Sequence, residues 1–389
     1  MPDTRHLHTV VQVGAGLALN VFPAIFIAIY ARIAPIETQG FLALALAVGV
    51  YVAQLFNAFV VEGRLATPDA EGPLGLPAWV VAVALAAAGL LAVGPAVASS
   101  PILMASSIGI MTGLLMSRSI GVVTGEWKRE GIGALALIVS SVVALVMSAQ
   151  QNPHCVRVLA LGAFLAVVVR YHPRRSMPHM GFPPDVRRSS WVTGETAVVG
   201  AVQPAITSVL LVMVGPVASV TFRVITTVAG AVEPILAYGR YRLLAHGHRG
   251  ELKAFVAVFA VGMVVVLIAA FGGLGGLVFG PAWHAVGAVA MLLGCLWKVV
   301  TLVSTVPFAA LRKAGETVLV FWIRAASTVV YLVVSVGFLL LWENISAIFL
   351  AFVVSETITA VVYHCAAVRG APEYAASFGS RLVRERFAR

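Results

Sequence analysis

Residues 194–242 read GETAVVGAVQPAITSVLLVMVGPVASVTFRVITTVAGAVEPILAYGRYR, and this stretch decides how the whole chain is interpreted. It predicts an apolar helix over about 196–214, a tight turn at Gly215-Pro216 and a second apolar helix. The second helix carries Arg223 and Glu233 at depths from which a lipid bilayer normally excludes charge. The stretch therefore indicates a membrane-spanning hairpin with charged groups inside it.

The N-terminal hairpin repeats this pattern 181 residues earlier, without a gap. The matched pairs are Pro23 with Pro204, Ile25 with Ile206, Pro35 with Pro216, Phe41 with Phe222, and Gly49 with Gly230. Because proline is rare inside helices, two proline pairs in one register indicate a duplication. A second match, 184 residues apart, relates 127–131 to 311–315.

The composition predicts an all-α polytopic membrane protein. Hydrophobic residues make up 60% of the chain and charged residues 11%, and the mean hydropathy is +0.98. Such a chain has too few polar residues to cover a water-facing surface. We expect no cleavable signal peptide, because the first apolar run is long and lacks a small-residue cleavage site. The three cysteines are far apart and suggest neither a disulfide framework nor a metal site.

Twelve spans are predicted from apolar runs of about 20 residues. They cover roughly 9–33, 39–61, 76–97, 101–123, 131–149, 154–170, 195–214, 217–238, 253–279, 284–308, 317–341 and 345–368. With a cytoplasmic N-terminus, 20 of the 26 Lys and Arg residues fall on the cytoplasmic side, and only Arg32 and Arg157 fall outside. This asymmetry predicts an inner (cytoplasmic) membrane protein with both termini in the cytoplasm.

The predicted domains follow from the duplication. Residues 1–171 form an N-terminal six-helix bundle, 172–194 a basic cytoplasmic linker, and 195–370 a C-terminal six-helix bundle. Because six is even, both bundles start from the cytoplasm and form a parallel repeat about an axis along the membrane normal. Residues 371–389 form a basic tail that lies on the membrane as an amphipathic helix or is simply solvated.

Three segments carry a family resemblance. Ile33–Phe41, Phe279–Ala285 and Ala309–Glu316 resemble the corresponding turns of polysaccharide flippases. These flippases belong to the multidrug, oligosaccharidyl-lipid and polysaccharide (MOP) exporter superfamily, with Wzx-type and MurJ-type flippases and MATE drug exporters. The resemblance implies two six-helix bundles around a central cavity that opens to alternate sides of the membrane.

Four cations lie within the predicted spans and are candidate substrate-binding residues: Arg118, Arg223, Lys298 and Arg324. Each would cost about 2.5–3.5 kcal/mol if it faced lipid at mid-membrane. They are therefore expected to face a watery cavity or a partner. For Arg118 and Arg324, which are nearer the cytoplasmic end, snorkelling to the membrane surface is the alternative.

Two acids at similar depth, Glu233 and Glu356, are candidate coupling residues or structural partners of the cations. Pro23 and Pro204 each free a backbone carbonyl, and such breaks at matching places in two repeats indicate a substrate site. The nearby amides are the remaining candidates: Asn20, Gln54, Asn57 and Gln203. They are expected to bind sugar hydroxyls or, alternatively, to join helices.

These features favour a flippase that moves a polyprenyl-diphosphate-linked oligosaccharide from the inner to the outer leaflet. A MATE-like cation-coupled small-molecule antiporter and a membrane-embedded glycan polymerase or ligase are the alternatives. The sequence has no catalytic constellation, no metal-ligand spacing and no nucleotide-binding loop, so we expect neither an enzyme nor a cofactor. The expected partners are the lipid-linked glycan, membrane lipids and other polysaccharide assembly proteins, and not nucleic acid.

Overall fold

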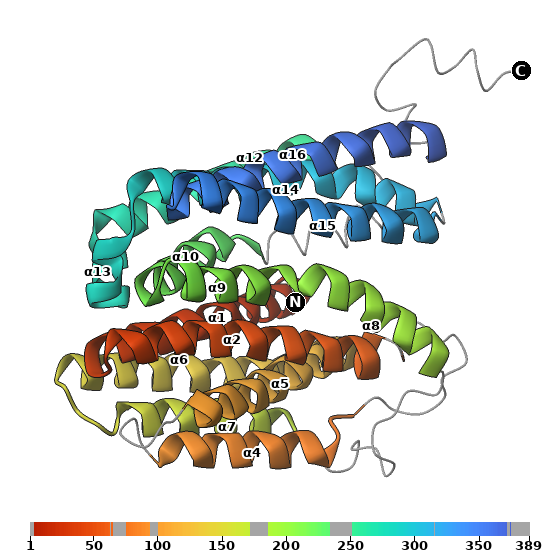
Figure 1. Ribbon diagram of the computed structural model, residues 1–389. Coiled ribbons are helices and arrows are strands. Elements are labelled where there is room, and N and C mark those ends of the chain that lie inside the picture. The colour runs from red at the N-terminus through yellow and green to blue at the C-terminus, as the bar shows by residue number, and fades with distance from the viewer. Residues whose placement is uncertain are drawn as a thin grey trace, which may run out of the picture. The chain divides into compact units, whose positions relative to one another are not determined.

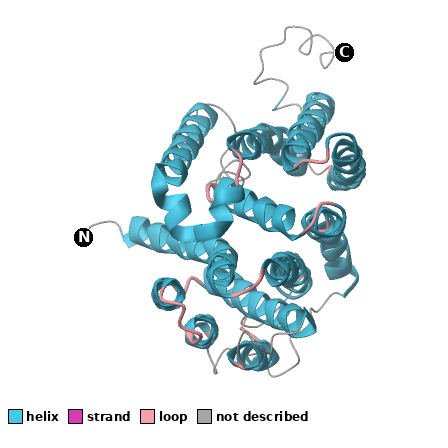
Figure 2. Ribbon diagram, turned by 60° about the vertical axis from the view of Figure 1, so that its left-hand side comes forward, coloured by secondary structure: helices cyan, strands magenta, loops and turns pink. Residues whose placement is uncertain are grey.

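The computed structural model describes residues 4–62, 64, 75–93, 100–171, 186–233, 251–314, 316–371 and 374. Every regular element in these residues is a helix, as Figures 1 and 2 show. The predicted all-α class is therefore confirmed. The linker residues 172–185 and most of the tail from 372 onward lie outside the described residues.

Contacts divide the chain into two compact units, Met1–Thr227 with Gly275–Ala285 (unit 1) and Val228–Leu274 with Val286–Arg389 (unit 2). The helices of unit 1 are α1 (Thr4–Ile33), α2 (Ile36–Asn57), the π-helix η1 (Ala58–Glu62), α4 (Ala78–Ala92), α5 (Ser100–Thr124), α6 (Trp127–Ala149), α7 (Cys155–Arg170), α8 (Val186–Gly200), α9 (Val202–Met213), most of α10 (Pro216–Gly230), α13 (Gly275–Phe279) and the 3₁₀ helix η3 (Gly280–Ala285). Unit 2 contains α12 (Glu251–Ala269), the π-helix η2 (Ala270–Leu274), α14 (Ala288–Lys313), α15 (Thr317–Trp342) and α16 (Ile345–Gly370).

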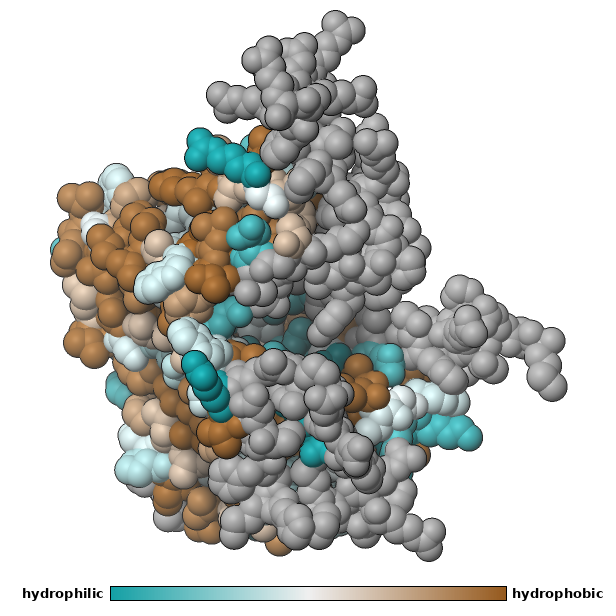
Figure 3. Space-filling model, turned by 90° about the vertical axis from the view of Figure 1, so that its right-hand side faces the viewer, coloured by the Kyte–Doolittle hydropathy of each residue, from teal (hydrophilic) through white to brown (hydrophobic). Residues whose placement is uncertain are grey.

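Each of the twelve predicted spans corresponds to helical structure. Nine described helices are long and apolar enough to cross a membrane, and α4 and α10 are shorter apolar helices. The sixth predicted span is the 16-residue α7. Large apolar side chains are exposed on the outward faces of these helices, for example Val212 at 84% and Ile268 at 68%. Figure 3 shows such side chains covering much of the coloured surface, as lipid-facing helices require.

The two matched prolines behave differently in the structure. Pro23 lies inside α1, and the helix continues through it without interruption. Near Pro204, the helix is interrupted at Ala201, and Pro204 occupies the third position of α9. A proline in the first helical turn removes an N–H that has no partner within the helix, whereas Pro23 must leave the carbonyl of Leu19 without its usual donor. The helix before this break starts at Val186, inside the expected linker.

Small residues let the helices of unit 1 approach closely. α2 packs along α5, and α6 packs along α7. A Cβ atom on Gly49 of α2 would lie 2.7 Å from the carbonyl oxygen of Ser107 on α5. Only glycine allows this approach, in the manner of small-residue contacts between membrane helices.

Arg32 joins the end of α1 to the segment before α14. Its guanidinium donates to the carbonyl oxygens of Leu277 at 2.7 Å and Val278 at 3.0 Å, and to Ala28 at 2.7 Å within α1. These carbonyls of Leu277 and Val278 belong to α13, which follows a kink at Gly273 (φ 112°). A planar guanidinium can serve several carbonyls at once, so the single cation satisfies helix-end acceptors.

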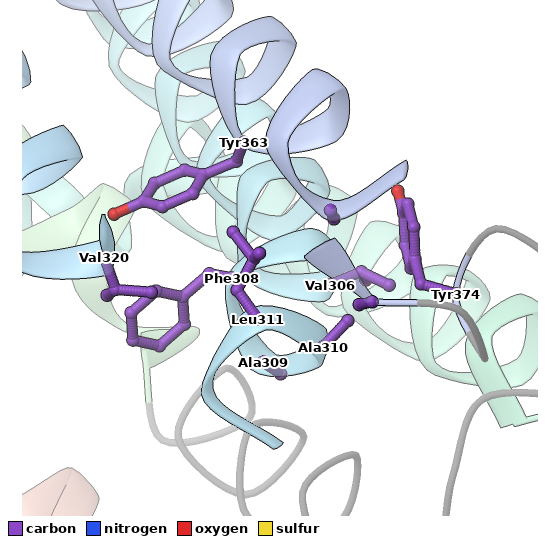
Figure 4. Packing of buried hydrophobic residues seen from close by; sticks show 10 residues of the cluster. Val306, Phe308, Ala309, Ala310, Leu311, Val320, Tyr363 and Tyr374 are labelled. Atoms are coloured by element: carbon purple, nitrogen blue, oxygen red, sulfur yellow. The ribbon is translucent and has the colours of Figure 1, made fainter. Parts of the chain in front are cut away.

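One core of unit 2 lies where α14, α15 and α16 meet (Figure 4). The ring of Phe308 on α14 meets that of Tyr363 on α16 edge-on, with centroids 5.8 Å apart. Tyr374, from beyond α16, is 3% exposed, and its hydroxyl lies 2.9 Å from Nδ1 of His364. Burial raises the pKa of Tyr374 to about 12, so its hydroxyl stays protonated at physiological pH. The start of the tail is thereby anchored to unit 2.

Candidate functional site

Lys298, on α14, is the most completely partnered of the predicted cations. Its Nζ donates to Oε1 of Glu233 and lies 3.9 Å from the centroid of the Trp297 ring. The side chain of Lys298 is 7% exposed, whereas that of Glu233 is 46% exposed. An ammonium group over an indole face is a favourable cation–π contact, and its strength increases when water is excluded. The structure therefore brings together two of the residues predicted from sequence, 65 positions apart.

Glu356, on α16, lies in the same part of unit 2. Its two carboxylate oxygens accept hydrogen bonds from Ser304 Oγ on α14 and from the hydroxyl of Tyr331 on α15. Trp297 Nε1–H in turn donates to Tyr331 at 3.0 Å. Glu356 is 9% exposed, so its charge is satisfied by hydroxyl groups and not by a cation.

A chain of contacts therefore connects the two predicted acids. It runs from Glu233 through Lys298 to the ring of Trp297, and from Trp297 through Tyr331 to Glu356. Phe352 packs against Trp297 and Tyr331, with ring centroids 4.8 and 5.4 Å apart. Aromatic packing fixes the indole on which the ammonium of Lys298 rests. We call these residues the Lys298 cluster: Glu233, Trp297, Lys298, Ser304, Tyr331, Phe352 and Glu356.

Arg324, on α15, has a different environment. Its guanidinium carbon lies 4.3 Å from the centroid of the Phe308 ring, and the residue is partly exposed. A guanidinium stacked on a ring that belongs to a hydrophobic core has a structural role of its own.

In unit 1, Arg223 forms a hydrogen bond with Gln203, another candidate residue from the sequence. Arg223, on α10, is 7% exposed, and its Nη1 donates to Oε1 of Gln203 on α9 at 3.2 Å. The hydroxyl of Thr226 donates to the backbone oxygen of Arg223 at 3.0 Å. The predicted hairpin of residues 194–242 thus places one buried guanidinium beside one amide, at the point where the helix is interrupted.

The other predicted amides lie on α1 and α2. Asn20 and Gln54 are exposed, whereas Asn57 is 8% exposed and its Nδ2 donates to Glu62 at 3.2 Å. Asn57 is the last residue of α2, which changes to the π-helix η1 directly after it.

A buried charge cluster that sequence reasoning missed lies around Arg118. Glu130, at the start of α6, is 0% exposed and pairs with Arg170 at the end of α7 at 3.0 Å. Arg118 of α5 is close enough to Glu130 to act on its carboxylate electrostatically. A Cβ on Gly121 would overlap Oε1 of Glu130, so glycine makes room for this charge. We call Arg118, Glu130 and Arg170 the unit 1 triad.

Glu130 was overlooked because it precedes the predicted fifth span, 131–149, and so was assigned to a cytoplasmic loop. Arg170 was likewise at the end of the predicted sixth span, 154–170. One feature of the sequence could have indicated this ion pair: Glu130 and Arg170 have opposite charges and lie at the ends of two consecutive spans that meet on the same side of the membrane. The guanidinium of Arg118 also contacts helix α1 at Gly16, where a Cβ would be 2.6 Å from Nη2.

Across the described residues, no group of three or more His, Cys, Asp or Glu side chains is arranged to hold a metal ion. The charged residues of the two units are instead paired with hydroxyl, amide, aromatic or oppositely charged groups.

No protein-family model and no curated protein sequence matches the chain. Solved structures do. A MATE transporter in complex with MaL6 aligns with a TM-score of 0.50 and 14% identity, over 93% of each chain. An outward-facing multidrug resistance MATE transporter of the MOP superfamily aligns at 0.49 and 14%, over 96% of this chain and 97% of that one. A mutant of the Vibrio cholerae MATE transporter VcmN aligns at 0.45 and 14%, over 95% and 97%.

At this level of identity, the alignment with the first of these structures speaks for the fold alone. It extends over nearly the whole length of both chains, and it agrees with the succession of long apolar helices. The chain is therefore an all-α, multi-pass membrane protein with the fold of the MATE transporters.

Proposed function

We propose that this protein is a membrane transporter of the MOP type that moves a polyprenyl-diphosphate-linked oligosaccharide from the inner to the outer leaflet by alternating access. The observation that carries the proposal is Lys298, a buried cation on a spanning helix whose ammonium rests on the ring of Trp297. Arg223 supplies a second buried cation in unit 1. A transporter of the MATE fold needs such groups when its solute is an anion.

The chemistry of a diphosphate fits these side chains. Phosphate oxygens accept charge-assisted hydrogen bonds from guanidinium and ammonium groups, which are about twice as strong as neutral ones. The oligosaccharide would be held by amides such as Gln203, and the polyprenyl chain would remain in the bilayer. A negative charge that leaves a negative cell interior gains about 2.3 kcal/mol per 100 mV. The membrane potential therefore favours export without a nucleotide.

In this proposal the protein lies in the inner membrane with both termini in the cytoplasm, and it acts together with other polysaccharide assembly proteins. The unit 1 triad is placed outside the transport site, since its central carboxylate is paired with Arg170. Arg324 and Arg118 are accordingly assigned a supporting role.

A second candidate is a MATE-like cation-coupled antiporter of small molecules. The observation that favours it is Glu356, a buried carboxylate that accepts two hydroxyl hydrogen bonds and has no cationic partner among the interactions described above. Such a group can take up and release a proton during a transport cycle. Under the flippase proposal Glu356 is a coupling residue, whereas under the antiporter proposal it is the main site.

The experiment is a flipping assay in proteoliposomes with a fluorescent polyprenyl-diphosphate oligosaccharide. We expect each of Arg223→Ala and Lys298→Ala to reduce flipping, and the double variant to abolish it at unchanged protein level. Lys298→Arg should retain more activity than Lys298→Gln, because the charge is kept. The matched control is Lys128→Ala, since Lys128 also lies over its preceding tryptophan, at 5.7 Å, but is exposed.

Two results would separate the candidates. Wild-type flipping in the double variant would mean that the anionic lipid is held elsewhere, and it would remove the main support for a flippase. Uptake of small organic cations into acid-loaded vesicles, lost in Glu356→Gln and unchanged in Lys298→Gln, would establish the antiporter.

A further inference from the structure

Lys298 has two partners of very different mobility. The ring of Trp297 is held by its Nε1–H bond to Tyr331 at 3.0 Å and by packing against Phe352. It belongs to the same helix as Lys298 and stays beneath the ammonium whatever else is bound. This contact can hold the side chain in place, but it does not neutralise the charge.

Glu233 is the other partner, and its position allows the carboxylate to move away from Lys298. It lies three residues beyond the end of α10 at Gly230, directly after the turn of residues 231–232. The side chain of Glu233 is 46% exposed, against 7% for Lys298. Water can therefore solvate Glu233 once it moves away, whereas Lys298 would be left as a buried charge, which is costly unless another anion replaces the carboxylate.

From this asymmetry we infer that Glu233 is an exchangeable counter-ion, which occupies the diphosphate position on Lys298 when the site is empty and is displaced when the lipid diphosphate binds. The inference rests on the proposed function and adds how the site is regulated. A bound diphosphate repels the neighbouring carboxylate, because both are negative, so a phosphate oxygen on Lys298 favours the departure of Glu233.

The exchange gives the transport site a release step. Lys298 stays paired throughout, first with Glu233, then with a phosphate oxygen, then with Glu233 again. The return of the carboxylate competes with the bound diphosphate and so limits its affinity. A site without this competitor binds its substrate more tightly and releases it more slowly, which raises the affinity at the expense of turnover.

The test measures binding of farnesyl diphosphate, a short polyprenyl diphosphate, to the purified full-length protein in nanodiscs by calorimetry. Glu233→Gln is expected to bind about fivefold tighter, the effect of removing one half-exposed charge partner, and to flip more slowly. Glu233→Asp, whose shorter side chain keeps the charge, should fall between the wild type and Glu233→Gln. Lys298→Gln should bind far more weakly than the wild type.

Glu343→Gln is the matched control, because Glu343 is exposed at the end of α15 and is not a member of the Lys298 cluster. It should bind as the wild type does. Uridine diphosphate serves as a second ligand: equal affinity for it would mean that the site does not distinguish a lipid-linked diphosphate from a free nucleotide diphosphate, which would overturn the lipid specificity.

Failure of the inference and failure of the proposed function give different results. Unchanged or weaker binding by a folded Glu233→Gln, with the wild type binding farnesyl diphosphate and Lys298→Gln losing it, would overturn the counter-ion role alone. If Glu233→Gln is unfolded, tighter binding by Glu233→Ala is the required result. No binding of any diphosphate by the wild type would overturn the proposed function as well.

Discussion

Glu130 and Arg170 form the most deeply buried ion pair described in unit 1, with side chains 0% and 1% exposed. Removing one member of such a pair leaves the other as a buried charge without compensation, which costs about 3–5 kcal/mol. Glu130→Gln is therefore expected to lower the free energy of unfolding in detergent by that amount. Replacement of both residues by apolar ones of similar size, Glu130→Leu with Arg170→Met, should recover much of the loss.

The control for this prediction is Glu126→Gln. Glu126 pairs with Arg129 at 3.3 Å, but the two side chains are 21% and 36% exposed, so the pair contributes about 1 kcal/mol or less. Denaturation curves of the three variants, measured together, check the difference. Equal losses of unfolding free energy for Glu126→Gln and Glu130→Gln would contradict the view that burial makes the Glu130–Arg170 pair more important than the Glu126–Arg129 pair.

At the residue scale, the sequence predicts which charges are unusual but not which partners they have. Lys298 and Arg223 stand out because they interrupt apolar runs. The partner of Lys298 is 65 positions away, on a different helix, and depends on how the helices pack. Glu130 does not stand out at all, since a charge at the end of a span is normally in water. Its burial follows from Gly121, which leaves space for the carboxylate.

The close approach of α2 and α5 leads to a prediction at the scale of the element. A Cβ at Gly49 would lie 2.7 Å from a backbone oxygen that cannot move without shifting α5. Gly49→Ala is therefore expected to destabilise unit 1 by about 1–3 kcal/mol, as overpacking does. The thermal midpoint of the purified protein in detergent is the measurement.

Gly89 provides the opposite case within the same unit. It lies in α4, and a Cβ there would meet nothing within 4 Å. Gly89→Ala should raise stability by up to about 1 kcal/mol, because alanine favours the helix and no contact opposes it. A loss of stability in Gly89→Ala equal to that in Gly49→Ala would contradict the view that the α2–α5 contact sets the cost at Gly49.

The elements themselves were largely predictable, because hydrophobic runs of spanning length leave few alternatives to a helix. Turns at prolines were predicted correctly where Pro35 precedes α2 and Pro216 begins α10. The interruption at Ala201 lies close to Pro204, where a break was expected, whereas the two π-helices were not predictable. Each depends on how neighbouring helices pack, which a single sequence does not contain. The continuity of α1 through Pro23 has the same origin.

At the scale of the whole molecule, the sequence repeat and the packing of the helices divide the chain at different places. The duplication relates residues by register, with Pro23 matched to Pro204, whereas the contacts group α8 and α9 with the N-terminal helices in unit 1. The predicted domain boundaries after residues 171, 194 and 370 therefore remain a prediction from the repeat. The fold shared with MATE transporters was predictable from the span layout, but the solute was not, because it depends on the few residues that line the transport path.

The orientation in the membrane is the last prediction, and it follows from the distribution of Lys and Arg. The linker and the C-terminal tail carry many of these residues, so residues 172–194 should face the cytoplasm, and the turn before α16 should face outward. After Cys155, Cys295 and Cys365 are replaced, single cysteines at Ser176 and Ser346 can be labelled with an impermeant maleimide. In spheroplasts, Ser346→Cys should be labelled directly, and Ser176→Cys only after permeabilisation. The reverse pattern would invert the orientation, and the membrane potential would then oppose export of an anionic lipid and could no longer drive it.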